Sequence, residues 1–166
     1  MTGGDLDPRV ILATLGVADA GAIAPITGGR DTAIYRVSYG RATYALRVFR
    51  PEQAQVARSE VLAMQAASEG GVPVPRVHAE GIHDGRPALL LEWCEGQTVA
   101  DALMHRPERA TTLGMACGET LAQIHAVTVP AAYQDDSWLR WSGLASDGPL
   151  YQQLIAVARR DRLLHL

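Results

Sequence analysis

The chain has 166 residues and a mass of 17.8 kDa, enough for one ordinary domain. Hydrophobic residues make up 48% and charged residues 20%, which is typical of a globular protein and argues against a disordered one. The formal net charge of −3 argues against a nucleic-acid-binding protein, which usually carries a basic face. No apolar run approaches the roughly 20 residues that cross a bilayer, and the first 20 residues do not resemble a secretion signal. We therefore expect a cytoplasmic protein without nucleic-acid or membrane partners.

The spacing of the two cysteines also favours a cytoplasmic protein. Cys94 and Cys117 have neither the spacing of a metal site nor that of a disulfide framework. We expect both thiols to be reduced and partly buried, as is usual in the cytoplasm.

The first 50 residues predict a short helix followed by strands. Asp7-Pro8 is typical of a helix start, and Gly16 ends that helix. Three antiparallel strands fit residues 20–49, and the last two, at 32–39 and 42–49, alternate in side-chain character.

A longer helix and two more strands come next. The helix begins at Pro51, runs to about Ser68 and ends at Gly70-Gly71. Strands are expected near 76–82 and 87–93, and the second is apolar enough to be central and buried.

Beyond residue 95 only helices are predicted. Thr98 begins one at 98–106 and forms a capping box with Asp101. A longer helix follows at 107–127, then a loop at 128–148 and a helix at 149–166. The order of elements indicates an α+β fold with a change of character near residue 95.

One charged pair stands out between the third strand and the long helix. Because successive side chains of a strand alternate between faces, Arg47 shares a face with Ala45 and Phe49. Glu60 lies in the middle of the apolar stripe of the helix, where a carboxylate is unfavourable unless it is paired. We therefore predict an ion pair between Arg47 and Glu60.

These residues resemble a kinase motif. Tyr44-Ala45-Leu46-Arg47 resembles the V-A-I-K strand, and Glu60 resembles the helix glutamate that orients its basic residue over nucleotide phosphates. Arginine instead of lysine is found in many members of the aminoglycoside phosphotransferase and choline kinase families. Those families are also similar to this sequence in further segments that occur in the same order: Ile26–Gly29, Val72–Pro75, Leu90–Trp93, Glu95-Gly96, Leu113-Gly114 and Leu121–His125. The resemblance covers about residues 22–128.

The resemblance implies a protein-kinase-like fold. Residues 1–94 would form a nucleotide-binding N-lobe, a five-stranded antiparallel sheet with one packed helix. Residues 95–166 would form the hinge or linker and the first helices of a truncated helical C-lobe.

The resemblance also implies a site for ATP or GTP. The Gly28-Gly29 turn would approach phosphate closely, and Ala45 would leave room for an adenine ring. Arg47 would hold the α- and β-phosphates while Glu60 fixes its direction, and the backbone at 92–94 would read the edge of adenine. The candidate nucleotide-binding residues are Gly28, Gly29, Ala45, Arg47, Glu60, Glu92, Trp93 and Cys94.

Simpler interpretations stay open for these features. Arg47 and Glu60 could form a purely structural ion pair. Gly28-Gly29 lacks the G-x-G-x-x-G pattern and could be an ordinary hairpin turn. For His125, the resemblance implies a packing and hydrogen-bonding role rather than that of a general base.

The residues for phosphoryl transfer are absent from this sequence. The reaction needs an aspartate at the acceptor hydroxyl, with an asparagine and a second aspartate on Mg²⁺. The sequence contains no His-Gly-Asp, no asparagine and no lysine, and the surroundings of Asp135-Asp136 do not match a metal-binding segment. We expect no catalytic and no metal-binding residue here, Mg²⁺ being held by residues not present in this chain, and no activity of the chain alone.

Three functional hypotheses follow. The first is that the chain is the truncated nucleotide-binding part of a phosphotransferase acting on a small-molecule hydroxyl. Its acceptor, bound mainly by the missing lobe, could be an aminoglycoside, choline, homoserine or a sugar. The second is a non-catalytic, pseudokinase-like module for nucleotide binding or interaction, and the third is a structural domain with an ordinary ion pair.

Overall fold

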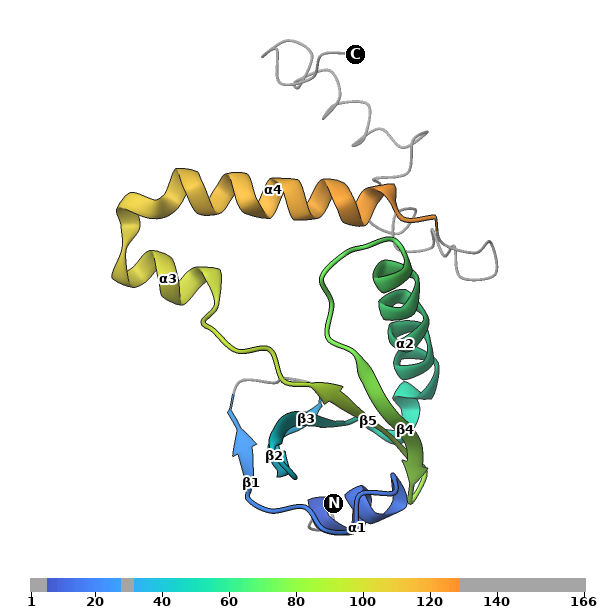
Figure 1. The fold of residues 1–166 in the computed structure, drawn as a ribbon. Helices are drawn as coiled ribbons and strands as arrows, with labels where there is room; N and C mark the ends of the chain where they lie inside the picture. The colour runs from blue at the N-terminus through green and yellow to red at the C-terminus, as the bar shows by residue number, and fades with distance from the viewer. Residues whose placement is uncertain (1–5, 28–31, 129–166) are drawn as a thin grey trace. The chain divides into compact units, whose positions relative to one another are not determined.

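The computed structural model describes residues 6–27 and 32–128, which belong to one compact unit. The predicted loop at 128–148 and the helix at 149–166 lie outside this part, apart from Thr128. A five-stranded antiparallel sheet forms its centre, in the order β1-β2-β3-β5-β4 (Figure 1). The strands are β1 (Ile23–Ile26), β2 (Ala33–Tyr39), β3 (Ala42–Val48), β4 (Val77–His83) and β5 (Arg86–Glu92). The predicted α+β class and the five-stranded antiparallel sheet are confirmed.

β5 is an inner strand of the sheet, as its apolar sequence predicts. It lies between β3 and β4, and Pro87–Leu91 are all buried. The turn that joins β4 to β5 has two residues in the left-handed region, Asp84 at φ 47° and Gly85 at φ 73°. Positive φ at both central positions is typical of the tight hairpin turn whose twist matches that of the strands. This turn thus fixes the register between β4 and β5 from His83 back to Ala79, where a bulge shifts it.

One face of the sheet packs against α1 (Pro8–Thr14). Asp7 caps this helix by accepting a hydrogen bond from the backbone N–H of Arg9 at 2.9 Å. Ile11 and Leu12 are buried against a cluster that includes Val37, Leu46, Val48 and Leu90. The short N-terminal helix expected from Asp7-Pro8 is present and packs on the face of the sheet opposite α2. Ile11 and Leu12 of α1 thus cover part of the second face, together with Val17 and Ala20 from the segment after the helix.

The other face packs against α2 (Ala54–Glu69), which follows the short 3₁₀ turn at Pro51–Gln53. Ala57 and Val61 of the helix are buried against Phe49, Leu89 and Leu91 of the sheet. Because α2 is anchored directly on β5, its position relative to the sheet is set by apolar packing. This face carries the predicted nucleotide site.

The segment after β5 is helical, with boundaries close to those predicted. α3 spans Val99–His105, Pro107–Arg109 form a 3₁₀ turn, and α4 spans Ala110–Ala126. Thr98 Oγ1 accepts a hydrogen bond from the backbone N–H of Asp101 at 3.1 Å and donates one to its carboxylate at 2.6 Å. The capping interaction predicted for α3 is therefore present. Within the described residues, no helix is both long enough and apolar enough to cross a lipid bilayer.

Both cysteines are free but exposed, so the expectation of partial burial was wrong. Cys94 lies just beyond the end of β5, where the chain leaves the sheet. Cys117 lies on α4, none of whose residues is buried.

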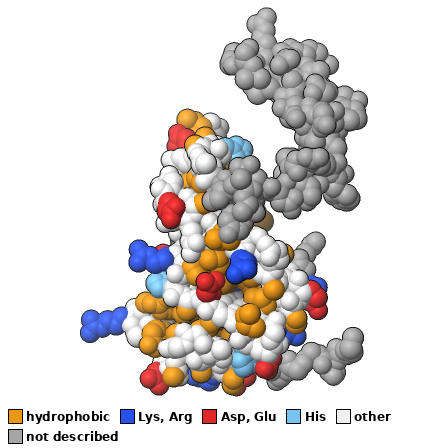
Figure 2. All heavy atoms as spheres, turned by 90° about the vertical axis from the view of Figure 1, so that its right-hand side faces the viewer, with side chains coloured by type: hydrophobic (Ala, Val, Ile, Leu, Met, Phe, Trp, Pro, Cys, Tyr) orange, Lys and Arg blue, Asp and Glu red, His pale blue; other side chains and the backbone are white. Residues whose placement is uncertain are grey.

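Charged side chains are mixed on the side of the molecule seen in Figure 2. Acidic and basic groups lie among hydrophobic and neutral ones on this side, and neither sign forms a continuous patch.

Candidate nucleotide-binding site

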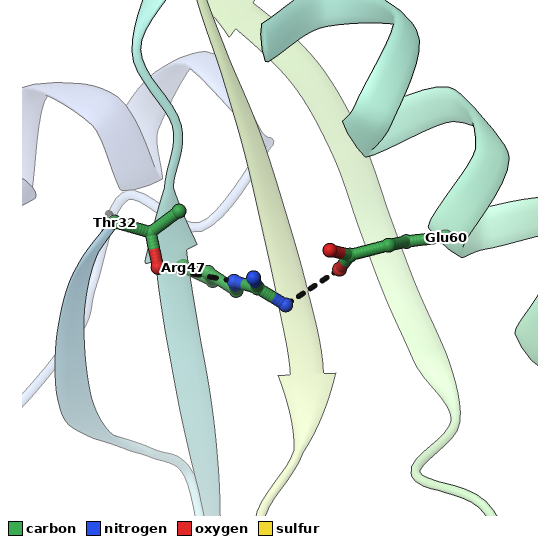
Figure 3. A network of polar contacts seen from close by, with 3 residues as sticks. All are labelled: Thr32, Arg47 and Glu60. Atoms are coloured by element: carbon green, nitrogen blue, oxygen red, sulfur yellow. Dashed lines mark hydrogen bonds and ion pairs between the residues drawn. The ribbon is translucent and has the colours of Figure 1, made fainter. Parts of the chain in front are cut away.

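Arg47 is anchored by two side chains (Figure 3) and also lies over an aromatic ring. Its Nη1 atom lies 2.5 Å from Oε2 of Glu60, so the predicted ion pair is present. Its Nε–H group donates a hydrogen bond to Oγ1 of Thr32 at 3.2 Å. The guanidinium carbon lies 4.7 Å from the ring centroid of Phe49, within the range of a cation–π interaction. β3, α2 and the residue just before β2 therefore converge on this charge.

The pair is neither fully buried nor fully exposed. The side chains of Arg47 and Glu60 keep 31% and 32% of their exposure. A guanidinium has five N–H donors, and these two hydrogen bonds use two of them. Arg47 thus has a fixed position and unused donors at a face that water reaches, which is the arrangement required for binding an anion from solution.

The strand register places Arg47 and Ala45 in adjacent rows on the same face of the sheet. One row crosses β2, β3 and β5 at Ile34, Arg47 and Leu89, and the next at Arg36, Ala45 and Leu91. Because residues two apart on a strand share a face, the rows are separated by about 7 Å. The strand positions expected for the phosphates and for the base therefore lie side by side.

The predicted hinge leaves the sheet at the end of β5. The backbone N–H of Glu92 donates to the carbonyl of Arg76 at 2.8 Å, and the backbone N–H of Arg76 donates to the Glu92 carboxylate at 3.3 Å. Within the described part of the chain, the backbone N–H groups of Trp93 and Cys94 donate no hydrogen bond. These two donors are thus available next to the row of Ala45.

The glycine turn cannot be placed in this geometry. Gly28 and Gly29 lie outside the described residues, although Thr27 and Thr32 on either side are described. The role predicted for the two glycines stays a prediction.

The structure adds two residues that the sequence analysis did not single out. Thr32 holds Arg47, and Arg36 contacts the predicted hinge, where its guanidinium carbon lies 4.9 Å from the ring centroid of Trp93. Ile34 pairs with Arg47 in the sheet, so alternation along β2 places Thr32 and Arg36 on the face of Arg47. The register between β2 and β3 was the signal that could have identified both.

Two other site predictions concern residues away from this face. His125 is exposed and makes no hydrogen bond with the described residues, and the packing role implied for it by the resemblance stays a prediction. Among residues 6–27 and 32–128, no group of three or more histidine, cysteine or acidic side chains could hold a metal ion.

The solved structures similar to this chain include the following two. One is a protein from Haemophilus somnus 129PT assigned as a fructosamine-3-kinase, with 17% identity and a TM-score of 0.46 over 54% of this chain and 31% of that one. The other is a protein from Ralstonia eutropha JMP134 assigned as an aminoglycoside phosphotransferase, with 18% identity and a TM-score of 0.42 over 55% of this chain and 28% of that one. The chain thus spans less than a third of the length of each.

Family membership is decided by the sequence itself. No curated protein matches the chain significantly. A family model does match it, over residues 22–165, which include the β-sheet, the Arg47–Glu60 pair and the segment after β5. Because this match covers most of the sequence, the chain belongs to the phosphotransferase enzyme family (APH).

Proposed function

We propose that this chain binds a nucleoside triphosphate, ATP or GTP, on the face of the sheet that carries Ala45 and Arg47. The observation that carries the proposal is the anchored guanidinium of Arg47, held by Glu60 and Thr32 with donors to spare. Membership in the phosphotransferase family supports a nucleotide as the anion. The protein to which this sequence belongs would transfer a phosphoryl group to a hydroxyl of a small molecule, in the cytoplasm, where ATP and GTP are supplied.

The phosphates would bind to Arg47. A guanidinium can donate two parallel N–H groups to two phosphate oxygens, and the contact with Glu60 fixes the orientation of the guanidinium plane. In this proposal Gly28 and Gly29, which connect β1 to β2, bring backbone N–H groups to the same phosphates.

The base would bind in the neighbouring row. Ala45 has the smallest side chain in the row that includes Arg36 and Leu91, so a flat ring can approach the sheet there. The free backbone N–H of Cys94 and the backbone carbonyl of Glu92 would read the edge of the base. Trp93 lies between these two groups.

Catalysis would depend on residues that this sequence does not contain. Phosphoryl transfer requires an asparagine and two aspartates around Mg²⁺ and the acceptor, and the sequence has no asparagine. We propose that the 166 residues bind nucleotide without transferring phosphate, and that the acceptor and Mg²⁺ bind mainly elsewhere. The absence of asparagine equally favours a second candidate, a non-catalytic nucleotide-binding module.

Replacing Arg47 tests nucleotide binding directly. We expect Arg47→Ala to weaken ATP binding about 10-fold to 100-fold, because a charged hydrogen bond contributes about 1.5–3 kcal/mol. Arg47→Lys should fall between this variant and the natural sequence, since lysine keeps the charge and loses the two-pronged geometry. Isothermal titration of the full chain with ATP, and separately with GTP, measures both effects.

The matched control is Arg41→Ala, an exposed arginine at the turn between β2 and β3. It should leave affinity and stability unchanged. If the natural chain binds neither nucleotide, the proposal is wrong. If Arg47→Ala lowers stability but leaves nucleotide affinity unchanged, the ion pair is purely structural.

A further inference from the structure

Arg36 connects β2 to the segment that follows β5. Its guanidinium carbon lies 4.9 Å from the ring centroid of Trp93, and its Nη2 atom lies 3.7 Å from Oε1 of Glu95. The side chains of Arg36 and Glu95 are 48% and 77% exposed, so the ion pair is long, solvated and weak by itself. The contact with the indole ring is the more directional of the two interactions.

This connection crosses an intervening strand. β3 lies between β2 and β5, and Arg36 pairs with Ala45 in the sheet. Arg36 and Trp93 therefore meet across β3, on the face of the sheet that carries Ala45 and Thr43. Arg36 is the β2 member of the row proposed for the base, so this contact joins the β2 side of that row to the segment after β5.

The segment after β5 has few other attachments. Glu92 is hydrogen-bonded to Arg76, but no further hydrogen bond or ion pair holds Trp93 or Cys94 within the described residues. Gly96 then adopts φ +127°, which a side chain would strain. Arg36 is thus the side chain that joins this short stretch of backbone to the neighbouring part of the sheet.

We propose that Arg36 is a positioning residue for the base end of the nucleotide site. By holding Trp93 and Glu95, it keeps the free backbone N–H of Cys94 at the edge of the sheet beside Ala45. This inference rests on the nucleotide binding proposed above. It separates the site into two ends that depend on different arginines: Arg36 acts on the base through the hinge, and Arg47 acts on the phosphates.

Binding of nucleotide fragments distinguishes the base end of the site from the phosphate end. We propose titrating the full chain with ATP, adenosine and inorganic tripolyphosphate at 0.15 M salt, where the screening length is about 8 Å. Arg36→Ala should weaken ATP and adenosine binding by the same factor, about 3-fold to 10-fold, and leave tripolyphosphate binding unchanged. Arg47→Ala should do the opposite, weakening ATP and tripolyphosphate while adenosine binds as before.

Two further variants refine the assignment. Arg36→Lys keeps the charge and loses the planar group, so it should restore adenosine binding only partly. Glu95→Gln removes the ion pair and leaves the ring contact, so its effect should have the same direction and be smaller. All substituted side chains are exposed except that of Arg47, and a thermal unfolding midpoint for each variant shows that it is folded.

Several results would overturn the inference. If Arg36→Ala weakens tripolyphosphate binding as much as adenosine binding, Arg36 acts only through its charge. If Arg36→Ala strengthens ATP binding, Arg36 blocks the base rather than supporting its site. In both cases ATP binding by the natural chain would leave the proposed function intact. Failure of the natural chain to bind any of the three ligands would overturn both proposals.

Discussion

The pairing of Arg47 with Glu60 shows how a strand and a helix place a charge without burying it completely. A fully buried pair loses so much hydration that its contribution to stability becomes small, and a fully exposed pair is screened by water and salt. Here each side chain keeps about a third of its exposure. The guanidinium of Arg47 also contacts the ring of Phe49 and donates a hydrogen bond to Thr32. These two interactions replace part of the interaction with water that Arg47 loses. The charge is fixed and still accessible to a ligand.

Glu60→Gln tests the energetic role of this pair. The substitution removes the negative charge while keeping the size of the side chain and a hydrogen-bond acceptor. We expect the free energy of unfolding to fall by about 1–2 kcal/mol, between the values typical of exposed and of buried pairs. Urea denaturation followed by circular dichroism measures the change.

Glu69→Gln on the same helix is the control for this measurement. Glu69 is exposed, so its substitution should change stability by less than about 0.5 kcal/mol. Equal effects of the two substitutions would show that the Arg47–Glu60 contact contributes nothing beyond an ordinary surface charge.

At the level of single residues, the sequence predicted the Arg47–Glu60 ion pair but not the residues around it. Arg47 and Glu60 could be paired because a charge on an apolar strand face and a carboxylate in an apolar helix stripe each require a partner. Thr32 and Arg36 are polar residues of a strand with an exposed surface, where such residues are common and need no partner. Their roles follow only from the register between β2 and β3, which depends on a turn and on packing.

At the level of elements, β5 joins two separate cores. Leu89 lies in the cluster beneath α2, and Leu90 lies in the cluster beneath α1 on the opposite face. Both are 2% exposed. Neighbouring residues with the same side chain thus support different helices, and only α2 carries a residue of the proposed site.

This arrangement predicts a difference between two matched variants. Leu89→Ala and Leu90→Ala should each lower the free energy of unfolding by about 2–4 kcal/mol, since both remove a buried leucine. Only Leu89→Ala should also weaken ATP binding, because it loosens the contact that positions α2 and therefore Glu60. Denaturant unfolding and ATP titration at 15 °C, where both variants keep more of their folded population, measure the two effects.

Equal losses of ATP affinity in both variants would contradict a specific role for α2. They would indicate instead that any loss of stability reduces binding. The comparison is informative because the two substitutions change the same number of atoms in the same strand.

The elements themselves were largely predictable from the sequence. Alternation in β2 and β3, the turn between β4 and β5 and the proline and glycine limits of α2 are local signals, and the structure follows them to within one to three residues. The packing of α1 on the sheet was not predicted. The seven residues of that helix contain only two buried positions, too short a pattern to identify the sheet face that it covers.

At the level of the whole molecule, the amino-acid composition is compatible with nucleotide binding but lacks a residue type that phosphoryl transfer typically requires. The sequence contains 15 arginines but no asparagine and no lysine, so the metal ligand set typical of phosphoryl transfer cannot be completed by its own side chains. In the proposed site, Arg47 and backbone N–H groups bind the nucleotide.

Two measurements on the purified chain test whether it binds nucleotide without catalysis. We expect no release or transfer of phosphate from ATP above the uncatalysed rate. We also expect ATP to bind at least as tightly in excess EDTA as with Mg²⁺, because metal-free ATP offers Arg47 more negative charge. Measurable turnover, or binding that requires Mg²⁺, would show that the chain does hold the metal.

The use of arginine in place of lysine at position 47 also determines how such a site can be detected. Nucleotide analogues with an acylating or sulfonylating group mark kinases by reacting with the amine of the lysine that contacts the phosphates. A guanidinium stays protonated at any physiological pH and is a poor nucleophile, and this sequence has no other side-chain amine to react. If the proposed nucleotide binding is correct, surveys that identify nucleotide-binding proteins by lysine labelling would miss this protein even when nucleotide is bound. Photoreactive nucleotides, which insert into C–H bonds near the base, would mark it.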